Sequence, residues 1–206
     1  MKAVCFGADR HVKTPWKNGG GTMTDLAVDG DAADVDGDRW RWRVGLANID
    51  ASGPFSDFSG YRRTIMLTGG PGFTLDFDQA PSERLDLPRR PFTFEGGWTT
   101  HCRLIDGSAT AFNLLWDPRR VAASLDVLAF DGPGTAPPLA ADVGLWHGLR
   151  GRADFDIGGR HFTIGPGDTL RIDRAAAGDA PALPVVVRDA AGCELAFVDI
   201  RQRPDA

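Results

Sequence analysis

The feature that most constrains the fold is the regular interruption of short alternating segments by glycine and proline. The chain has 206 residues, of which 26 are glycine and 14 are proline. In residues 39–49, bulky apolar side chains, beginning with Trp40 and Trp42, alternate with small or cationic ones. Alternation with a period of two predicts a strand with one apolar face. Because turn residues separate many such segments, the sequence predicts an all-β fold.

The second half of the chain repeats this plan. Residues 153–157, 160–164 and 169–172 are expected to form three strands joined by glycine-rich turns. Helical signals are few, and residues 118–124 are a short candidate helix. The segment 131–138, which is rich in glycine and proline, is the best candidate for an internal linker.

Charge and composition limit the partners. The net charge of −5 argues against a nucleic-acid partner, because phosphate binding requires a basic surface. No apolar run approaches the roughly 20 residues of a membrane span, and the first residues do not resemble a signal peptide. We therefore expect a cytoplasmic protein that binds neither membrane nor nucleic acid, and a homodimer stays open. Cys5, Cys102 and Cys193 are expected to be reduced, buried thiols.

The run from Pro15 to Thr22 carries the clearest functional signal. It joins Trp16, Lys17 and Asn18 to three successive glycines. Such glycines indicate a backbone with positive φ or a close approach to another group. The neighbouring amine and carboxamide supply hydrogen-bond donors. A flexible turn between strands is the alternative, but the stiff proline and the aromatic ring favour a shaped binding loop.

This run and four later motifs resemble the HutD/Ves family, small bacterial proteins of the cupin class. The later motifs are Trp42-Arg43 with Ala47, the stretch from Gly53 to Gly60, Arg63-Thr64 with the turn at Gly70-Pro71-Gly72, and Phe112-Asn113-Leu114. The chain departs from the family pattern at three positions, Asp25, Gly45 and Ala111, where the family usually has Glu, Ser and an acidic residue.

The resemblance implies a bicupin, with two stacked antiparallel β-barrels and few short helices. Residues 1–206 would form a single unit of this type, with an N-terminal barrel at 1–118 and a C-terminal barrel at 119–206. Catalytic cupins commonly hold a metal through a His-x-His pair, a later Glu and another His. This chain has four scattered histidines and no His-x-His, so we expect neither a metal nor another cofactor.

The remaining polar and aromatic residues of the motifs suit a small anion. Lysine and arginine pair with carboxylates, amides both donate and accept, and aromatic rings floor a pocket for a planar ligand. The alternatives are an ion pair with a surface carboxylate for Arg43, a solvated strand face for Arg63, a backbone partner for Asn113 and a core position for the rings. The candidate ligand-binding residues are Trp16, Lys17, Asn18, Asp25, Arg43, Phe55, Ser56, Arg63 and Asn113.

The first hypothesis is a metal-free binding protein without catalytic residues. The HutD resemblance implies a carboxylate ligand from histidine degradation (urocanate, formiminoglutamate or formylglutamate) and a regulatory or flux-limiting role in histidine utilisation, while the Ves resemblance implies a stress-linked role. The alternative is an enzyme that acts on a small nitrogenous acid with Lys17 and Asp25 as acid and base, which requires a lysine pKa lowered toward neutrality.

Overall fold

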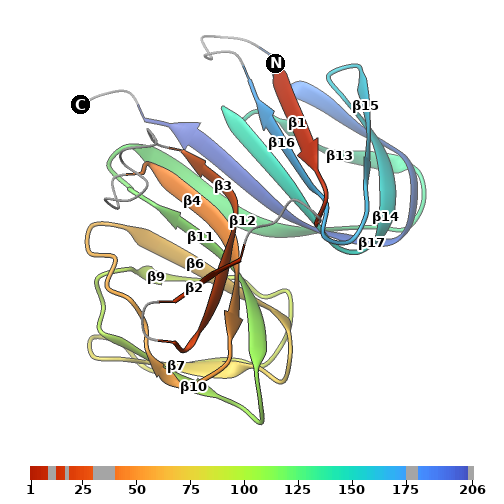
Figure 1. The fold of residues 1–206 in the computed structure, drawn as a ribbon. Coiled ribbons are helices and arrows are strands. Elements are labelled where there is room, and N and C mark those ends of the chain that lie inside the picture. The colour runs from red at the N-terminus through yellow and green to blue at the C-terminus, as the bar shows by residue number, and fades with distance from the viewer. Residues whose placement is uncertain (9–12, 17–18, 30–39, 175–180, 204–206) are drawn as a thin grey trace. The chain divides into compact units, whose positions relative to one another are not determined.

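A computed structural model describes residues 1–206 except 9–12, 17–18, 30–39, 175–180 and 204–206 (Figure 1). The described residues form strands and turns and contain no helix, so the all-β prediction is confirmed. They accordingly include no helix that is long and apolar enough to cross a membrane. The strands are β1 (Lys2–Phe6), β2 (Lys13–Pro15), β3 (Gly21–Asp29), β4 (Trp42–Ile49), β5 (Gly53–Pro54), β6 (Arg62–Gly69), β7 (Phe73–Phe77), β8 (Glu83–Leu85), β9 (Phe92–Glu95), β10 (Thr100–Leu104), β11 (Ala109–Trp116), β12 (Val121–Phe130), β13 (Gly134–Leu139), β14 (Val143–Ile157), β15 (Arg160–Ile164), β16 (Thr169–Asp173) and β17 (Leu183–Gln202).

The few short helices of the predicted fold are absent from the described residues, and the helix expected at 118–124 was a wrong prediction. The Asp117 carbonyl accepts hydrogen bonds from the amides of Arg120 and Val121, which makes a single turn. The Asp117 carboxylate also binds the Arg119 amide at 2.9 Å. The turn ends at once because Val121 begins the strand β12, where its side chain is 1% exposed. Core burial of a β-branched residue therefore overrides the local helical signal.

The chain divides into two compact units. The N-terminal unit comprises His11–Val121 and Arg203–Ala206, and the C-terminal unit comprises Met1–Arg10 and Ala122–Gln202. This grouping lies near the predicted boundary at 118/119 and differs from it in the first ten and the last four residues. The first residues join the later unit because β1 pairs antiparallel with β16, from Lys2 opposite Asp173 to Phe6 opposite Thr169.

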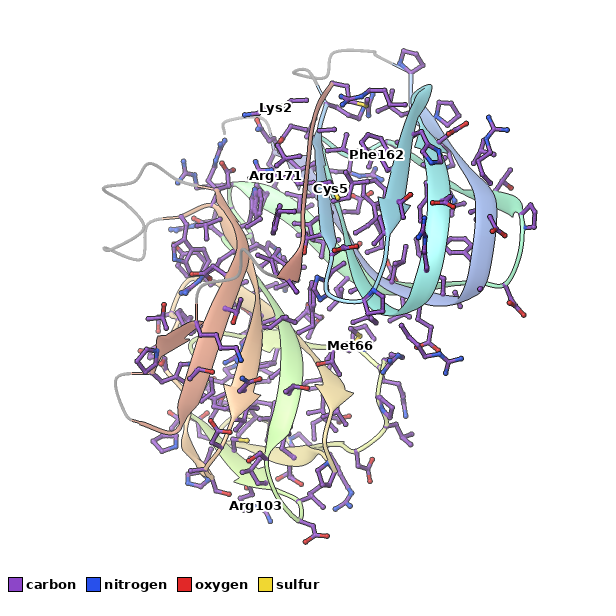
Figure 2. All side chains as sticks on the ribbon, turned by 45° about the vertical axis from the view of Figure 1, so that its right-hand side comes forward. Lys2, Cys5, Met66, Arg103, Phe162 and Arg171 are labelled. Atoms are coloured by element: carbon purple, nitrogen blue, oxygen red, sulfur yellow. The ribbon has the colours of Figure 1, made fainter. Side chains whose placement is uncertain are left out.

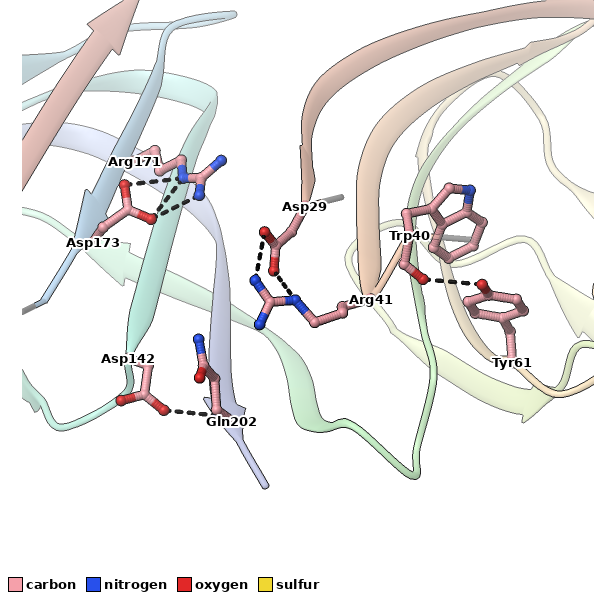
Figure 3. A network of polar contacts seen from close by, with 8 residues as sticks. All are labelled: Asp29, Trp40, Arg41, Tyr61, Asp142, Arg171, Asp173 and Gln202. Atoms are coloured by element: carbon pink, nitrogen blue, oxygen red, sulfur yellow. Dashed lines mark hydrogen bonds and ion pairs between the residues drawn. The ribbon is translucent and has the colours of Figure 1, made fainter. Parts of the chain in front are cut away.

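The C-terminal unit is built on a seven-stranded sheet with the order β1-β16-β14-β17-β12, in which β13 also pairs with β17 and β15 with β14. The three strands expected between residues 153 and 172 are confirmed. The predicted linker at 131–138 is largely strand β13, whose Pro137 and Pro138 lie at a register shift, where a proline costs no ladder bond. Two polar contacts of the C-terminal unit, Arg171 to Asp173 and the Gln202 amide to Asp142, are drawn in Figure 3.

The N-terminal unit contains two sheets. A six-stranded sheet has the order β2-β3-β4-β11-β6-β9, and a four-stranded sheet has the order β5-β10-β7-β8. Side chains of both sheets form one apolar cluster, which includes Ile49, Ile65, Phe73 and Leu75. The strand pairings among the described residues leave the sheets of both units open, so the predicted closed barrels are not confirmed.

The register of the six-stranded sheet decides which side chains share a face. Asn113 on β11 lies opposite Gly45 on β4 and Ile65 on β6, and Leu115 lies opposite Arg43 and Arg63. Because alternate residues of a strand point to the same face, this face carries Arg43, Arg63 and Asn113. The predicted small or cationic side of residues 39–49 therefore faces the same way as the two other polar motif residues.

Thiol burial differs from the prediction at one position. Cys102 and Cys193 are buried, and burial raises the pKa of their thiols to about 12 and about 11. Cys5 is exposed, contrary to the expectation that all three are buried. Cys5, which is labelled in Figure 2, belongs to strand β1 at the end of the sheet order. An edge strand is covered less than a central one.

Candidate ligand-binding site

The N-terminal unit contains a cavity of about 510 Å³ beside the face that carries Arg43, Arg63 and Asn113. This volume lies within the range of about 300–1,000 Å³ that is usual for small-molecule sites. Its wall combines aromatic and aliphatic side chains with a few charged ones, the usual composition of a ligand pocket. The lining residues are Thr14, Pro15, Trp16, Met23, Arg43, Ala47, Pro54, Phe55, Ser56, Asp57, Phe58, Arg63, Asn113 and Leu115.

Arg63 and Asn113 form the buried polar centre of this wall. The Nε and Nη2 groups of Arg63 donate to Oδ1 of Asn113 at 3.0 and 2.7 Å. Asn113 Nδ2 donates to the Ala111 carbonyl oxygen at 3.3 Å. The exposed fractions of Arg63 and Asn113 are 7% and 1%. The amide thus fixes the orientation of the guanidinium, and the backbone partner expected as an alternative for Asn113 is also present.

The guanidinium of Arg63 lies in a poorly solvated place. Its carbon atom is 4.4 Å from the ring centre of Phe55 and 5.7 Å from that of Phe94. Burial lowers the pKa of Arg63 from 12.5 to about 10, because a desolvated site disfavours the charged form. At neutral pH the side chain therefore still carries its positive charge.

Arg63 also keeps unused hydrogen-bonding capacity. It forms no ion pair with any carboxylate of the described residues, and its Nη1 group has no partner among them. Among the described residues, Trp40 Nε1 is the one side-chain nitrogen or oxygen atom that is both fully buried and without a hydrogen-bond partner. Because Nη1 of Arg63 also lacks a partner, it is not fully buried and retains access to the cavity. A desolvated cation with a free N–H pair favours an acceptor with negative charge.

Arg43 lines the same cavity, but its charge is already compensated. Its Nε and Nη2 groups donate to the two carboxylate oxygens of Asp25 at 2.6 and 3.0 Å. A register shift between Asp25 and Ala27 on β3 marks a bulge beside this pair. Asp25 itself is not a lining residue. The ion pair considered as the alternative for Arg43 is thus present, and it leaves Arg63 as the unpaired cation of the described wall.

The glycine run meets the backbone requirement expected from its sequence. Gly19 has a φ of 71°, and a Cβ atom on Gly21 would lie 2.1 Å from the Asn48 carbonyl oxygen. The Trp16 amide donates to the Gly21 carbonyl at 2.9 Å, and the Gly19 amide donates to the Trp16 carbonyl at 3.0 Å. Lys17 and Asn18 lie outside the described residues, so the cavity is described without them.

Trp16 and Phe55 form an aromatic part of the wall. Their ring centres are 6.2 Å apart with the planes 82° apart, an edge-to-face contact. Both rings are partly buried and pack against the core of the N-terminal unit. A smaller hollow of about 180 Å³, lined in part by Gly19 and Gly20, also borders on these rings. The rings therefore serve both as core and as cavity wall, which were the two alternatives.

We expect Gly21→Ala to lower the free energy of unfolding by about 1–3 kcal/mol, because the added methyl group has no room beside Asn48. Gly53→Ala is the matched control, since a Cβ atom there meets nothing within 4 Å and the backbone φ is ordinary. Urea unfolding of both variants measures the difference. Equal stability of the two variants would contradict the close approach.

Sequence reasoning missed several lining residues. Ser56, which is exposed, was a candidate, whereas its neighbours Asp57 and Phe58 were not. Both belong to the motif from Gly53 to Gly60, so the motif itself was the available signal. Met23 and Leu115 gave no signal, because their contribution depends on strand register alone.

A second group of polar contacts in the N-terminal unit involves residues that do not themselves line the cavity. Asp29 binds Arg41, and the Tyr61 hydroxyl donates to the Trp40 carbonyl at 2.9 Å (Figure 3). The rings of Trp40 and Tyr61 are 4.1 Å apart between centres. Trp40 is 1% exposed, so these contacts anchor the start of the β4 segment.

The described residues contain no group of three or more His, Cys, Asp or Glu side chains that is arranged to hold a metal ion. Of the described histidines, His147 is buried with Nδ1 at 2.9 Å from the Thr169 hydroxyl, and His161 lies 3.2 Å from Asp156. The described part of the cavity wall contributes Asp57 as its one carboxylate and no histidine or cysteine.

Comparison with known proteins identifies relatives over most of the chain. An uncharacterised 21.2 kDa protein in the hutC 3′ region of Pseudomonas putida is 35% identical over 168 residues, which are 81% of this chain and 84% of that protein. A conserved protein of unknown function from Pseudomonas aeruginosa has a crystal structure with a TM-score of 0.86 and 27% identity, covering 98% of this chain and 100% of that one. The structure of HutD from Pseudomonas fluorescens has a TM-score of 0.79 and 31% identity, with the same coverage of both chains.

A more distant likeness concerns the fold alone. An oxalate decarboxylase variant from Bacillus subtilis has a TM-score of 0.64 at 8% identity, and covers 96% of this chain and 76% of that one. Together with the strand-rich structure, such neighbours support a cupin-like fold. The sequence model of the HutD family matches residues 8–189, well beyond the five motifs. With this match and a relative at 35% identity, the chain belongs to the HutD family.

Proposed function

We propose that this protein binds a small carboxylate in the cavity of its N-terminal unit, and that the ligand is an intermediate of histidine degradation such as urocanate, formiminoglutamate or formylglutamate. Binding would serve a regulatory or flux-limiting role in histidine utilisation. The proposal includes no metal ion, since the described wall offers too few metal-binding groups.

One observation carries the proposal. Arg63 is a desolvated cation that lines a cavity of about 510 Å³ and has no carboxylate partner among the described residues. A buried charge without a counter-ion costs folding free energy, and a desolvated charged group in a cleft is a candidate for binding a ligand of opposite charge. The nearby rings of Trp16 and Phe55 suit the flat body of an unsaturated or amide-containing acid.

The relatives supply the biological direction. One is named HutD and another by its place in the hutC 3′ region, both in Pseudomonas. These names support a ligand that belongs to histidine utilisation.

Titration calorimetry with the three acids tests the proposal. We expect at least one of them to bind with a dissociation constant below about 1 mM, which corresponds to about −4 kcal/mol. Addition of EDTA should leave the affinity unchanged. Absence of heat and of a thermal shift with all three acids at millimolar concentration would remove the ligand assignment.

The alternative of an enzyme with Lys17 and Asp25 as acid and base gains no specific support. Both oxygens of the Asp25 carboxylate accept from Arg43, and Asp25 is not a lining residue. Incubation of the protein with each acid, followed by proton NMR, separates the two functions. We expect the spectra of the acids to stay unchanged over hours.

A further inference from the structure

The cavity wall carries a second unpaired charge, of sign opposite to that of Arg63. Asp57 lines the cavity and is exposed. Its Oδ1 atom accepts hydrogen bonds from the Ser59 amide at 2.8 Å and from the Ser59 hydroxyl at 2.7 Å. Asp57 forms no ion pair with a cation of the described residues, and its second oxygen has no partner among them. This oxygen therefore remains available as an acceptor.

The two unpaired charges differ in depth. Arg63 is 7% exposed, whereas Asp57 belongs to the exposed class. Phe55, which lies against the Arg63 guanidinium at 4.4 Å, is partly buried and precedes Asp57 by two residues. In order of increasing exposure, the wall thus carries a buried cation, a partly buried aromatic ring in contact with it, and an exposed carboxylate, which we take as the rim. Arg43 does not alter this order, because Asp25 compensates its charge.

A cavity that is positive inside and negative at its rim selects ligands by the sign of both ends. The inner end must supply a carboxylate to Arg63. A second carboxylate or a carbonyl oxygen at the rim would face Asp57, and like charges in a site disfavour binding. A cationic nitrogen or an N–H donor at the same place would gain a charge-assisted hydrogen bond.

We propose that Asp57 is a specificity-determining residue, and that the cavity prefers bipolar ligands with a carboxylate at the Arg63 end and a cationic or N–H-donating nitrogen at the Asp57 end. This inference rests on the proposed function, since it orients the ligand of that same cavity.

A pair of nearly isosteric acids makes the inference testable. Formiminoglutamate and formylglutamate differ in one group, which is a protonated nitrogen in the first and a carbonyl oxygen in the second. We expect the wild-type protein to bind the formimino acid about fivefold more tightly, the size of one partly solvated charge pair. In Asp57→Asn this preference should fall to near unity, through weaker binding of the formimino acid.

Titration calorimetry of both acids against wild type, Asp57→Asn and Asp106→Asn measures the preference. Asp106 is exposed and does not line the cavity, so its variant controls for the loss of one negative charge. An affinity ratio that is the same in all three proteins, with binding intact, would overturn the role of Asp57 and leave the proposed function standing. If neither acid binds to wild type, the role of Asp57 is overturned, and if urocanate also fails to bind, the proposed function is overturned with it.

Discussion

Arg63→Met is expected to weaken carboxylate binding about 100-fold while the protein stays at least as stable as wild type. Loss of one member of a desolvated charge pair typically costs about 2–5 kcal/mol of binding free energy. Among the described residues of the cavity wall, Arg63 is the cation that has no counter-ion. No other described side chain of the wall therefore supplies an unpaired positive charge to the carboxylate. Titration calorimetry and thermal unfolding of the same samples measure both quantities.

The expected stability follows from the direction of the Arg63 pKa. Folding lowers this pKa from 12.5 to about 10, so the charged side chain disfavours the folded state at every pH below about 10. The cost diminishes only as the pH rises from about 10 toward 12.5, because the unfolded chain binds more protons there. Methionine is uncharged, so Arg63→Met removes this cost at neutral pH. Asn113 then loses the Arg63 guanidinium as its hydrogen-bond donor, but it still borders the cavity, where water replaces that donor.

Arg62→Met is the matched control for this experiment. Arg62 is the neighbouring residue on β6, its side chain is 51% exposed, and it pairs with Glu95 outside the cavity. We expect Arg62→Met to bind the carboxylate ligand with the affinity of wild type. If Arg63→Met and Arg62→Met bind the ligand equally well, Arg63 is not the carboxylate partner.

Asn113→Leu is expected to destabilise the protein by about 3 kcal/mol, because it removes the acceptor of both Arg63 hydrogen bonds. A buried guanidinium without an acceptor carries its full desolvation cost. The double variant Arg63→Met/Asn113→Leu should recover most of this loss, since an apolar pair of similar volume replaces the polar one. Urea unfolding of the two single variants and the double variant completes the cycle.

Recovery in the double variant would identify the pair as a functional feature that folding does not require. A double variant as unstable as the sum of the single ones would instead mean that the coupling energy between Arg63 and Asn113 is near zero. In that case the loss in Asn113→Leu would not come from an unsatisfied Arg63 guanidinium, which would contradict the account of this pair.

The sequence predicted the strands more reliably than the places where they end. Alternation in residues 39–49 corresponds to β4, and the three strands near the C-terminus were also predicted. The error at residues 118–124 arose because Asp117 favours a turn, while the burial of Val121 that follows depends on tertiary packing. The strand at Gly134–Leu139 was missed because its prolines lie at a register shift on a sheet edge.

The site was predictable in part. The sequence motifs predicted ligand-binding roles for Trp16, Phe55, Ser56, Arg63 and Asn113, and all five residues line the cavity. Their mutual contacts were not readable from the sequence, because the Arg63–Asn113 pair joins residues 50 positions apart through strand register. The same limitation applies to the ion pair between Arg43 and Asp25, which a bulge on β3 accompanies. Their binding roles remain predictions.

The most direct test of the account is a crystal structure of the protein grown with formiminoglutamate or urocanate. We expect a carboxylate of the acid within about 3 Å of the Arg63 guanidinium nitrogens, the distance of a charge-assisted hydrogen bond. An acid bound at another part of the molecule, with the cavity beside Arg63 holding only water, would contradict the central claim that this buried cation is the carboxylate site.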